Sequence, residues 1–277
     1  MTEKTQKQEI GKWLFFSFMF LVSIIVVLPF VWMVLSSFKQ SHEFYLLKPT
    51  LFPEKFILDN YFELFQKWNF MVYYKNSIIV TAFQVASNAI IILFAGYGFA
   101  KYQFKGRNFF FIMILASTMI PWVATIIPLY IMANKLQLID TYTGLIFAGM
   151  ADAFGIFLAR NFMTTIPNAL IESARIEGAK ESRIFFSIII PSVKPLIAVV
   201  TIQKLISSWN AFQWPLLVVN SDKLRTLPIA IAKLSSQYND AYNLKMAAAT
   251  VSIIPVVILY AFFQKYFVEG ITLSGIK

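Results

Sequence analysis

The chain has 277 residues, of which 58% are hydrophobic and only 14% are charged, and its formal net charge at pH 7 is +10. So large an apolar fraction cannot be buried inside a soluble fold of this size, and it indicates a membrane protein. The lack of cysteine excludes disulfides and cysteine-based metal or redox sites, and a single histidine, His42, leaves few other metal sites.

Apolar segments long enough to cross a bilayer recur along the chain. A helix needs about 20 apolar residues to span the hydrocarbon layer. Six segments meet this length and predict an all-α membrane protein with six transmembrane helices: residues 13–35, 77–100, 109–132, 144–163, 195–219 and 246–268. The first is longer than the roughly 7–15 residues of a signal-peptide core, so we expect it to remain as an anchor.

Basic residues gather in short clusters at the ends of these segments, which fits membrane topology better than a nucleic-acid-binding face. Three lysines precede the first segment, and the short connection at residues 101–107 holds two lysines and an arginine. An even number of spans puts both termini on one side, and the positive-inside rule predicts that this side is the cytoplasm. We therefore expect cytoplasmic ends at residues 1–12 and 269–277 and a five-helix core at residues 77–268.

A polar segment at residues 165–191 interrupts the apolar pattern. Pro167 pre-sets a first helical turn, no breaker follows until Gly178, and glycine has the permissive backbone that ends a helix. A second helix is predicted over residues 179–190, stopping at Pro191. The segment is therefore a helix-turn-helix at the membrane surface, with this polar side: Glu172, Arg175, Glu177, Lys180, Glu181 and Arg183.

The apolar residues of this segment recur at three- and four-residue spacing, at Ile171, Ala174, Ile184, Phe185 and Ile188. Such a stripe is suited to enter a groove on another protein. The alternative is an ordinary loop whose helices lie on their own bundle, with Glu172 and Arg175 as a local surface pair. These residues by themselves leave both interpretations open.

The order Glu172-Ser173-Ala174, Gly178, Ile188 and Ile190-Pro191 is spaced as in the EAA loop of ABC importer permeases, and the segment resembles that loop. It departs at Ser173, where the family usually has alanine, and at Ile190, where it has leucine. Further stretches are similar to the carbohydrate-uptake group and most to the smaller permease of maltose-type importers: Phe104-Lys105-Gly106-Arg107, Met119-Ile120-Pro121 and residues 270–277.

The resemblance implies the type I ABC importer architecture, with these residues coupling it to an ATPase: Glu172, Ser173, Ala174, Glu177, Gly178, Ile188 and Pro191. It implies a non-catalytic subunit of an ATP-driven importer for a di- or oligosaccharide in the bacterial cytoplasmic membrane, forming half of the translocation pathway. The implied partners are a second permease, two ATPase subunits that bind ATP and Mg, and an external sugar-binding protein. No cofactor and no nucleic acid are expected on this chain itself.

The residues agree with a separate ATPase, because the chain contains no G-x-x-x-x-G-K-[ST] phosphate loop. Two alternatives stay open. One is an ABC permease for another solute, such as a polyamine or an amino acid. The other is a secondary transporter in which Asp152 would carry a coupled proton, although no internal repeat supports it. No set of residues inside the membrane suggests an intramembrane enzyme.

Polar residues inside the predicted spans are candidates for the pathway. Asp152 and Lys204 fall at a similar depth when about 1.5 Å is counted per residue, and charges there usually face a cavity or each other. A second group, Trp209, Asn210 and Gln213, offers the aromatic faces and hydrogen bonds that sugars use. Interfacial anchoring or helix contacts would explain this group as well.

Overall fold

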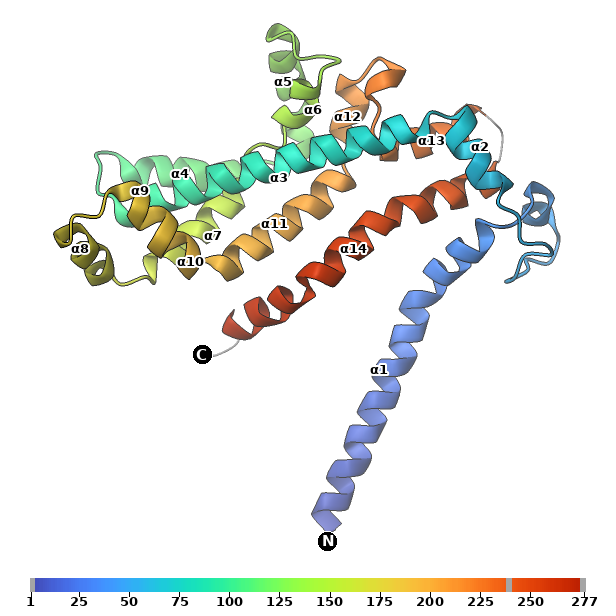
Figure 1. The fold of residues 1–277 in the computed structure, drawn as a ribbon, viewed down its shortest axis with the longest axis horizontal. Coiled ribbons are helices and arrows are strands. Elements are labelled where there is room, and N and C mark those ends of the chain that lie inside the picture. The colour runs from blue at the N-terminus through green and yellow to red at the C-terminus, as the bar shows by residue number, and fades with distance from the viewer. Residues whose placement is uncertain (1–2, 238–240, 275–277) are drawn as a thin grey trace. The chain divides into compact units, whose positions relative to one another are not determined.

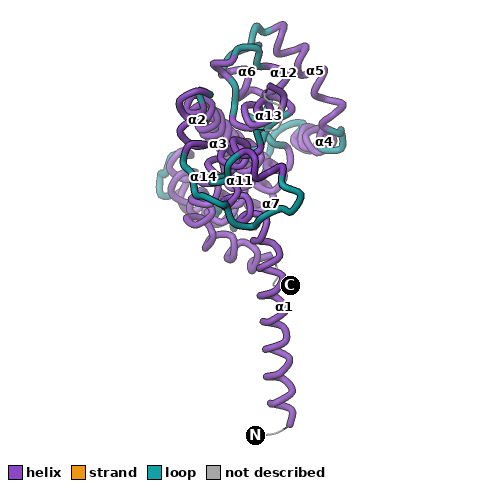
Figure 2. Tube along the Cα trace, turned by 90° about the vertical axis from the view of Figure 1, so that its right-hand side faces the viewer, coloured by secondary structure: helices purple, strands orange, loops and turns teal. Residues whose placement is uncertain are grey.

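The structure is a computed structural model of the chain, and it describes residues 3–237 and 241–274 (Figure 1). Every regular element within these ranges is helical, and none of them is a strand (Figure 2). This confirms the predicted all-α class. The last three residues of the predicted tail, 275–277, and the first two of the predicted N-terminal segment lie outside the described residues.

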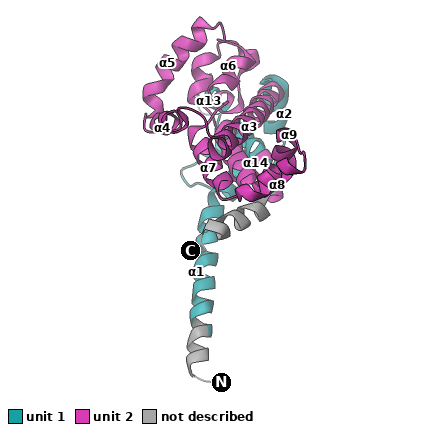
Figure 3. Cartoon of the chain, turned by 90° about the vertical axis from the view of Figure 1, so that its left-hand side faces the viewer, with its two compact units in different colours: residues 1–70, 231–254 teal, residues 71–230, 255–277 magenta. Residues whose placement is uncertain are grey.

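The chain divides into two compact units, residues 1–70 with 231–254 and residues 71–230 with 255–277 (Figure 3). In the first unit, helix α1 (Glu3–Ser36) contains the first predicted span. Its apolar side chains are exposed, Trp13 by 70% and Phe20 by 69%, which is the arrangement of a helix that faces lipid. A 3-10 turn, η1 (Ser41–Tyr45), and helix α2 (Asp59–Lys67) follow.

Buried polar contacts hold the first unit together after α1 ends. The side-chain amide of Asn60, which is 3% exposed, donates hydrogen bonds of 2.8 and 2.9 Å to the carbonyl oxygens of Ser37 and Lys39. Glu43 accepts from the backbone N–H groups of Gln40 and Glu54 at 2.8 and 2.9 Å. Because these bonds satisfy the backbone where the helix stops, they fix the chain's turn out of α1.

The second unit contains most of the other helices, whereas most of α13 and the first part of α14 belong to the first unit. In chain order the elements are α3 (Phe70–Lys101), α4 (Arg107–Ser117), α5 (Trp122–Lys135), α6 (Tyr142–Phe147), α7 (Ala153–Thr164), α8 (Asn168–Ile176), α9 (Glu181–Ile184), the π-helical turn η2 (Phe185–Ile189), α10 (Ile190–Ser192), α11 (Lys194–Trp209), α12 (Gln213–Val218), η3 (Asp222–Leu224), α13 (Leu227–Gln237) and α14 (Tyr242–Ser274).

Among the residues that the structure describes, three helices are long and apolar enough to cross a membrane alone, and two bent pairs raise the number to five. The predicted span 109–132 is broken between α4 and α5 by a bend of 106°. Pro121 begins α5 there, and a proline disfavours helical backbone at the residue before it. The predicted span 195–219 stops at Trp209 and resumes at Gln213, because Pro215 has no N–H to bond back to residue 211.

The predicted span 144–163 is the one that the structure divides most completely. Its two pieces, α6 and α7, have 6 and 12 residues, and the chain between them is not helical. At about 1.5 Å per residue, neither piece alone reaches across about 30 Å of hydrocarbon. A single continuous helix over residues 144–163 was therefore a wrong expectation.

Two apolar clusters form the core of the second unit. The larger joins the C-terminal half of α3 to α7, α8, the helix that begins at Glu181, and α11. Four fully buried residues lie at its centre: Ile92, Met163, Ile184 and Leu196. The smaller joins α3, α5, α6 and α12 around Leu145 and Trp214. Helix α3 contributes to both clusters, so it connects the two ends of the unit.

Candidate functional site

The polar segment at residues 165–191 forms the predicted helix-turn-helix. Helix α8 ends at Ile176, and Gly178 has a φ of +79°. The N–H of Gly178 donates to the carbonyl of Arg175 at 3.0 Å, and the N–H of Ala179 donates to that of Ala174 at 2.9 Å. This pair of bonds is the Schellman motif, whose left-handed residue is usually glycine. The prediction that Gly178 ends the first helix is confirmed.

The second helix differs from its predicted form. It begins at Glu181 rather than residue 179 and continues past Pro191 to Ser192. The N–H of Ile190 bonds five residues back, to the carbonyl of Phe185, which makes η2 a π-helical turn. Because the normal bonding ladder is already interrupted there, Pro191 does not end the helix. The chain then bends by 77° into α11.

The predicted apolar stripe does not face a partner. Ile171, Ile184 and Phe185 are 3%, 0% and 4% exposed and lie in the larger core cluster, against which Ala174 and Ile188 also pack. The expectation that this stripe enters a groove on another protein was wrong, because the stripe attaches the segment to its own helices. The outward face of α8 instead carries Glu172 and Ser173 together with two exposed apolar residues, Leu170 (50%) and Ile176 (88%).

Glu181 accepts hydrogen bonds from three other side chains. Its carboxylate accepts from Arg175 Nε at 2.6 Å, from the Tyr97 hydroxyl at 3.2 Å and from the Tyr102 hydroxyl. The bond to Glu181 raises the pKa of Arg175 above its ordinary value. The predicted surface pair of Arg175 with Glu172 is replaced by this pair with Glu181.

A second contact ties the same segment to α3. Lys101, the last residue of α3, donates through Nζ to the carbonyl of Ile166 and, at 2.9 Å, to Oδ1 of Asn168. Helix α8 is thus held at its start by Lys101 and beyond its end by the hydroxyl groups of Tyr97 and Tyr102. A displacement of α8 must therefore act on the C-terminal end of α3.

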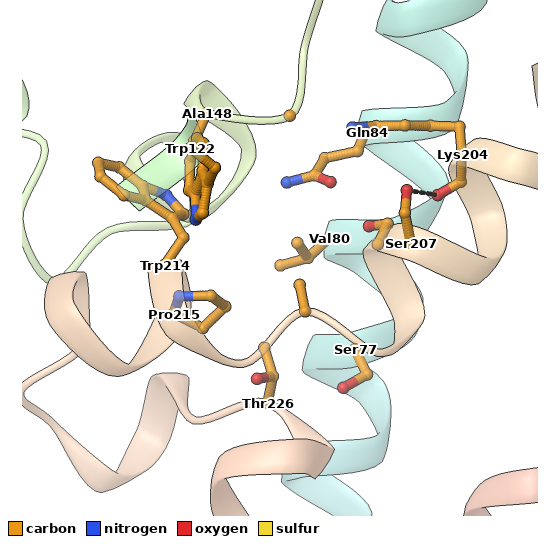
Figure 4. A pocket seen from close by; sticks show the side chains of 13 residues that line it. Ser77, Val80, Gln84, Trp122, Ala148, Lys204, Ser207, Trp214, Pro215 and Thr226 are labelled. Carbon is orange, nitrogen blue, oxygen red and sulfur yellow. Dashed lines mark hydrogen bonds between the residues drawn. The ribbon is translucent and has the colours of Figure 1, made fainter. Parts of the chain in front are cut away.

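A cavity of about 220 Å³ lies at the other end of the second unit (Figure 4). Helix α3 supplies Ser77, Val80 and Gln84, α5 supplies Trp122, and α11 supplies Lys204 and Ser207. Helix α11 also supplies Ser208, and α12 supplies Trp214 and Pro215. The remaining wall comes from non-helical connections: Ala148, Gly149, Ala211 and Thr226. The cavity therefore forms where three of the predicted spans are interrupted.

Hydrogen bonds fix the polar groups of this wall. The Gln84 side chain, 5% exposed, donates through Nε2 to the carbonyl of Leu145 at 2.9 Å. The indole N–H of Trp214 donates to the carbonyl of Gly144 at 2.9 Å, and that of Trp122 donates to Gln213 Oε1 at 3.0 Å. Both indole N–H groups are thus occupied within the protein.

The structure separates the predicted pathway residues. Lys204 lines the cavity, and Gln213 lies behind it as the partner of Trp122. Trp209 is 6% exposed and packs edge-on against Tyr74 at 5.8 Å between ring centroids. Asn210 donates to the carbonyl of Ile206 at 2.9 Å, so it extends the end of its own helix.

Asp152 has a different role from the one expected at the middle of a span. It is the N-cap of α7, and its carboxylate accepts from the N–H groups of Phe154 at 3.2 Å and Gly155 at 3.0 Å. No nitrogen–oxygen contact within 4.0 Å joins Asp152 to Lys204, both of which the structure describes. The expected direct ion pair is therefore missing, although the charge of Asp152 still acts on Lys204 at longer range.

Sequence reasoning did not identify Gln84, Trp122 or Thr226 as site residues, nor Tyr97 and Tyr102 as partners of Glu181. Each looks like an ordinary residue of a span or a loop when its neighbours in the chain are considered alone. The one available signal was Trp122 directly after Pro121, because a proline that interrupts an apolar segment marks a place where a cavity can form.

Comparison with known proteins gives a consistent result. Residues 88–273 match the family described as binding-protein-dependent transport system inner membrane component. The chain is 35% identical to the arabinooligosaccharides transport system permease protein AraQ of Halalkalibacterium halodurans, with 99% of each chain covered. It is 31% identical to the galactooligosaccharides transport system permease protein GanQ of Bacillus subtilis, with 95% of each covered.

A solved structure shares the fold. The crystal structure of a bacterial ABC transporter that imports the acidic polysaccharide alginate contains a chain that matches with a TM-score of 0.84 at 23% identity. The match covers 96% of this chain and 99% of that one.

Proposed function

The chain belongs to the family of binding-protein-dependent transport system inner membrane components, and from this premise we propose that it is a permease subunit of an ATP-driven oligosaccharide importer. The observation that carries the proposal is the similarity over the whole length to permeases of arabino- and galactooligosaccharide transport systems. A match over 99% of both chains leaves no large segment with an unrelated role.

We propose that the chain crosses the membrane six times, with both termini in the cytoplasm. Three unbroken helices, the bent pair of α4 and α5, and α11 together with α12 account for five crossings. The sixth is α6, the non-helical residues after it and α7 together. Non-helical backbone is tolerated at membrane depth where it is buried in protein or lines a cavity, and Ala148 and Gly149 line the cavity.

The outward face of α8 is proposed as the contact with a separate ATPase subunit. Leu170 and Ile176 expose apolar side chains on a helix whose opposite face is already buried, and Glu172 adds a charge beside them. Apolar residues within a charged rim are typical of helices that dock into grooves. ATP and Mg belong to that partner, and a second permease and an external sugar-binding protein complete the assembly.

Helix α3 supplies the proposed connection between ATPase and pathway. Tyr97, near its C-terminal end, bonds to Glu181, and Gln84, 13 residues earlier, lines the cavity. At about 1.5 Å per residue, a single helix carries a movement over roughly 20 Å between these sites. Closure of the ATPase subunits against α8 would then change the cavity wall, which is the requirement of alternating access.

The test is the energy source of uptake. Membrane vesicles containing this chain with its partner subunits and binding protein are loaded with ATP and given radiolabelled arabinotriose. Uptake should require ATP and should persist when an uncoupler collapses the proton gradient. Uptake that stops with the uncoupler and ignores ATP would instead identify a secondary transporter.

A further inference from the structure

We propose that the cavity of Figure 4 is a subsite of this chain for one saccharide ring of the cargo. This inference rests on the proposed function and adds the chemistry of recognition to it. Pockets for drug-sized ligands have volumes of about 300 Å³ or more, and this one has about 220 Å³. The cavity therefore suits a single ring, with the rest of an oligosaccharide extending from it.

Aromatic surface is the first feature that suits a sugar. Trp122 and Trp214 lie on one side of the cavity, and Lys204 and Ser207 lie on the other (Figure 4). Because both indole N–H groups bond to the protein, the rings are held in place and offer only apolar surface. The C–H face of a sugar ring packs on such a surface, and the indole of Trp122 is 41% exposed and accessible for it.

An unsatisfied hydroxyl is the second, independent feature. Thr226 lines the cavity with its side chain 4% exposed, and its Oγ1 has no hydrogen-bond partner in the protein. Nearly all buried polar side chains are hydrogen-bonded, and of the described buried side chains without a partner, Thr226 is the one that lines this cavity. A ring hydroxyl of a bound saccharide would provide that partner.

The charge of the wall is the third feature. Lys204 is the one charged residue among those that line the cavity, and the rest are amide, hydroxyl or apolar. Its ammonium group only donates hydrogen bonds. It is therefore suited to an acceptor oxygen on the ligand, which either a sugar hydroxyl or the carboxylate of an acidic sugar provides.

Thr226→Val is the sharpest test, because it keeps the shape of the side chain and removes only the hydroxyl. The complete importer in proteoliposomes is given radiolabelled arabinotriose or an alginate trisaccharide. We expect the KM for the imported probe to rise about fivefold, the effect of losing roughly one hydrogen bond, with no loss of thermal stability. Thr250→Val is the matched control, because Thr250 also has a buried hydroxyl without a partner but does not line the cavity.

Three further variants, at Trp122 and Lys204, test whether the aromatic face binds the ring and which ligand group Lys204 contacts. Trp122→Leu should raise the KM, and Trp122→Phe, which keeps an aromatic face, should restore most of the affinity. Lys204→Met should weaken import of whichever probe the wild type carries, and a larger loss for the acidic probe identifies a carboxylate as its acceptor.

The outcomes distinguish the two claims. If the wild-type importer carries a probe and the variants at Thr226, Trp122 and Lys204 all keep its KM, the subsite is overturned while the proposed function stands. If ATP drives no uptake of either probe by the wild type, the proposed function fails and the subsite falls with it.

Discussion

Individual residues at the ends of helices determine how this chain departs from simple spans. Asp152 illustrates the point, because its carboxylate accepts from the N–H groups of Phe154 and Gly155 and begins α7. The effect of a capping aspartate is local, because its oxygen accepts from N–H groups of the first turn that have no other partner in the helix. The cost of the charge at this depth is thereby offset by its own helix.

Replacing Asp152 by alanine should therefore destabilise the protein by about 1 kcal/mol, the usual effect of losing an N-cap. For a chain of this size we expect a decrease of about 2–4 °C in the unfolding midpoint of the detergent-solubilised complex. Asp152→Asn retains a capping oxygen and should remain close to the wild type.

The same experiment tests whether Asp152 acts as an ion-pair partner. Adding Lys204→Met to Asp152→Ala should not restore the midpoint, because the missing cap is independent of the lysine. Full recovery in the double variant would contradict the capping role and support the pair.

Residue-level prediction from the sequence succeeded where the cause is local. Gly178 was identified because a helix end that needs a positive φ selects glycine. The hydrogen bonds that Glu181 accepts from Arg175 and the two tyrosines could not be predicted in the same way. Glu181 lies beyond the turn, and Tyr97 and Tyr102 come from about 80 residues earlier in the chain, so only the fold brings them together.

At the scale of elements, the contact between the segment at residues 165–191 and α3 depends on Glu181. Its side chain is 46% exposed, so solvent screening reduces the value of each bond, but three donors converge on one carboxylate. Glu181→Ala should leave α8 packed through Ile171 and joined to α3 by the Lys101 hydrogen bonds alone, so that less of its movement reaches α3. ATP hydrolysis should then continue while uptake per ATP falls about threefold to tenfold, the equivalent of roughly 1 kcal/mol of lost coupling.

Arg183→Ala is the matched control, because it also removes an exposed charge from the same helix, and no hydrogen bond of its side chain to Glu181 is present. Uptake and ATP hydrolysis are measured together in proteoliposomes. Equal uptake per ATP in the Glu181 variant and the control would show that the three bonds do not transmit movement.

Apolar composition predicted where the membrane-spanning elements lie but not where they break. Pro29, Pro128 and Pro255 lie inside continuous helices, whereas Pro121 and Pro215 accompany breaks. A proline in the interior of a helix removes one backbone hydrogen bond. Whether the helix bends or ends there depends on which neighbours satisfy the freed carbonyl, and these neighbours come from other helices.

At the scale of the whole molecule, the orientation in the membrane follows from the basic inner segments and stays a prediction. Single cysteines can be introduced without interference, since the chain has none of its own. Those at the exposed positions Lys55 and Lys135 should react with an impermeant thiol reagent in intact cells, and those at Lys105 and Lys180 should react only after permeabilisation. Labelling of the cysteine at position 105 in intact cells would show that the chain has the opposite orientation in the membrane.

The cavity is also a property of the whole fold. Its wall combines residues from 77 to 226, and no short stretch of sequence contains enough of them to suggest a site. The family and its function could be predicted from the sequence because the motif that indicates them lies within one short stretch, residues 165–191. The cavity could not, because it is assembled from interruptions in several helices.

The central claim is that the segment around α8 couples this permease to ATP hydrolysis on another chain. The most direct measurement compares saccharide-stimulated ATP hydrolysis and uptake in proteoliposomes for Glu172→Ala and Gly178→Val. A Cβ at Gly178 meets no atom within 4 Å, so valine acts there only through the strained positive φ, at a cost of roughly 1–2 kcal/mol. Gly11→Val, at an exposed and equally open glycine, is the control.

Both coupling variants should insert in the membrane and assemble with their partners like the wild type. They should lose most stimulated hydrolysis and uptake, while Gly11→Val keeps them. Wild-type transport by both Glu172→Ala and Gly178→Val would contradict the account and leave the segment an ordinary loop.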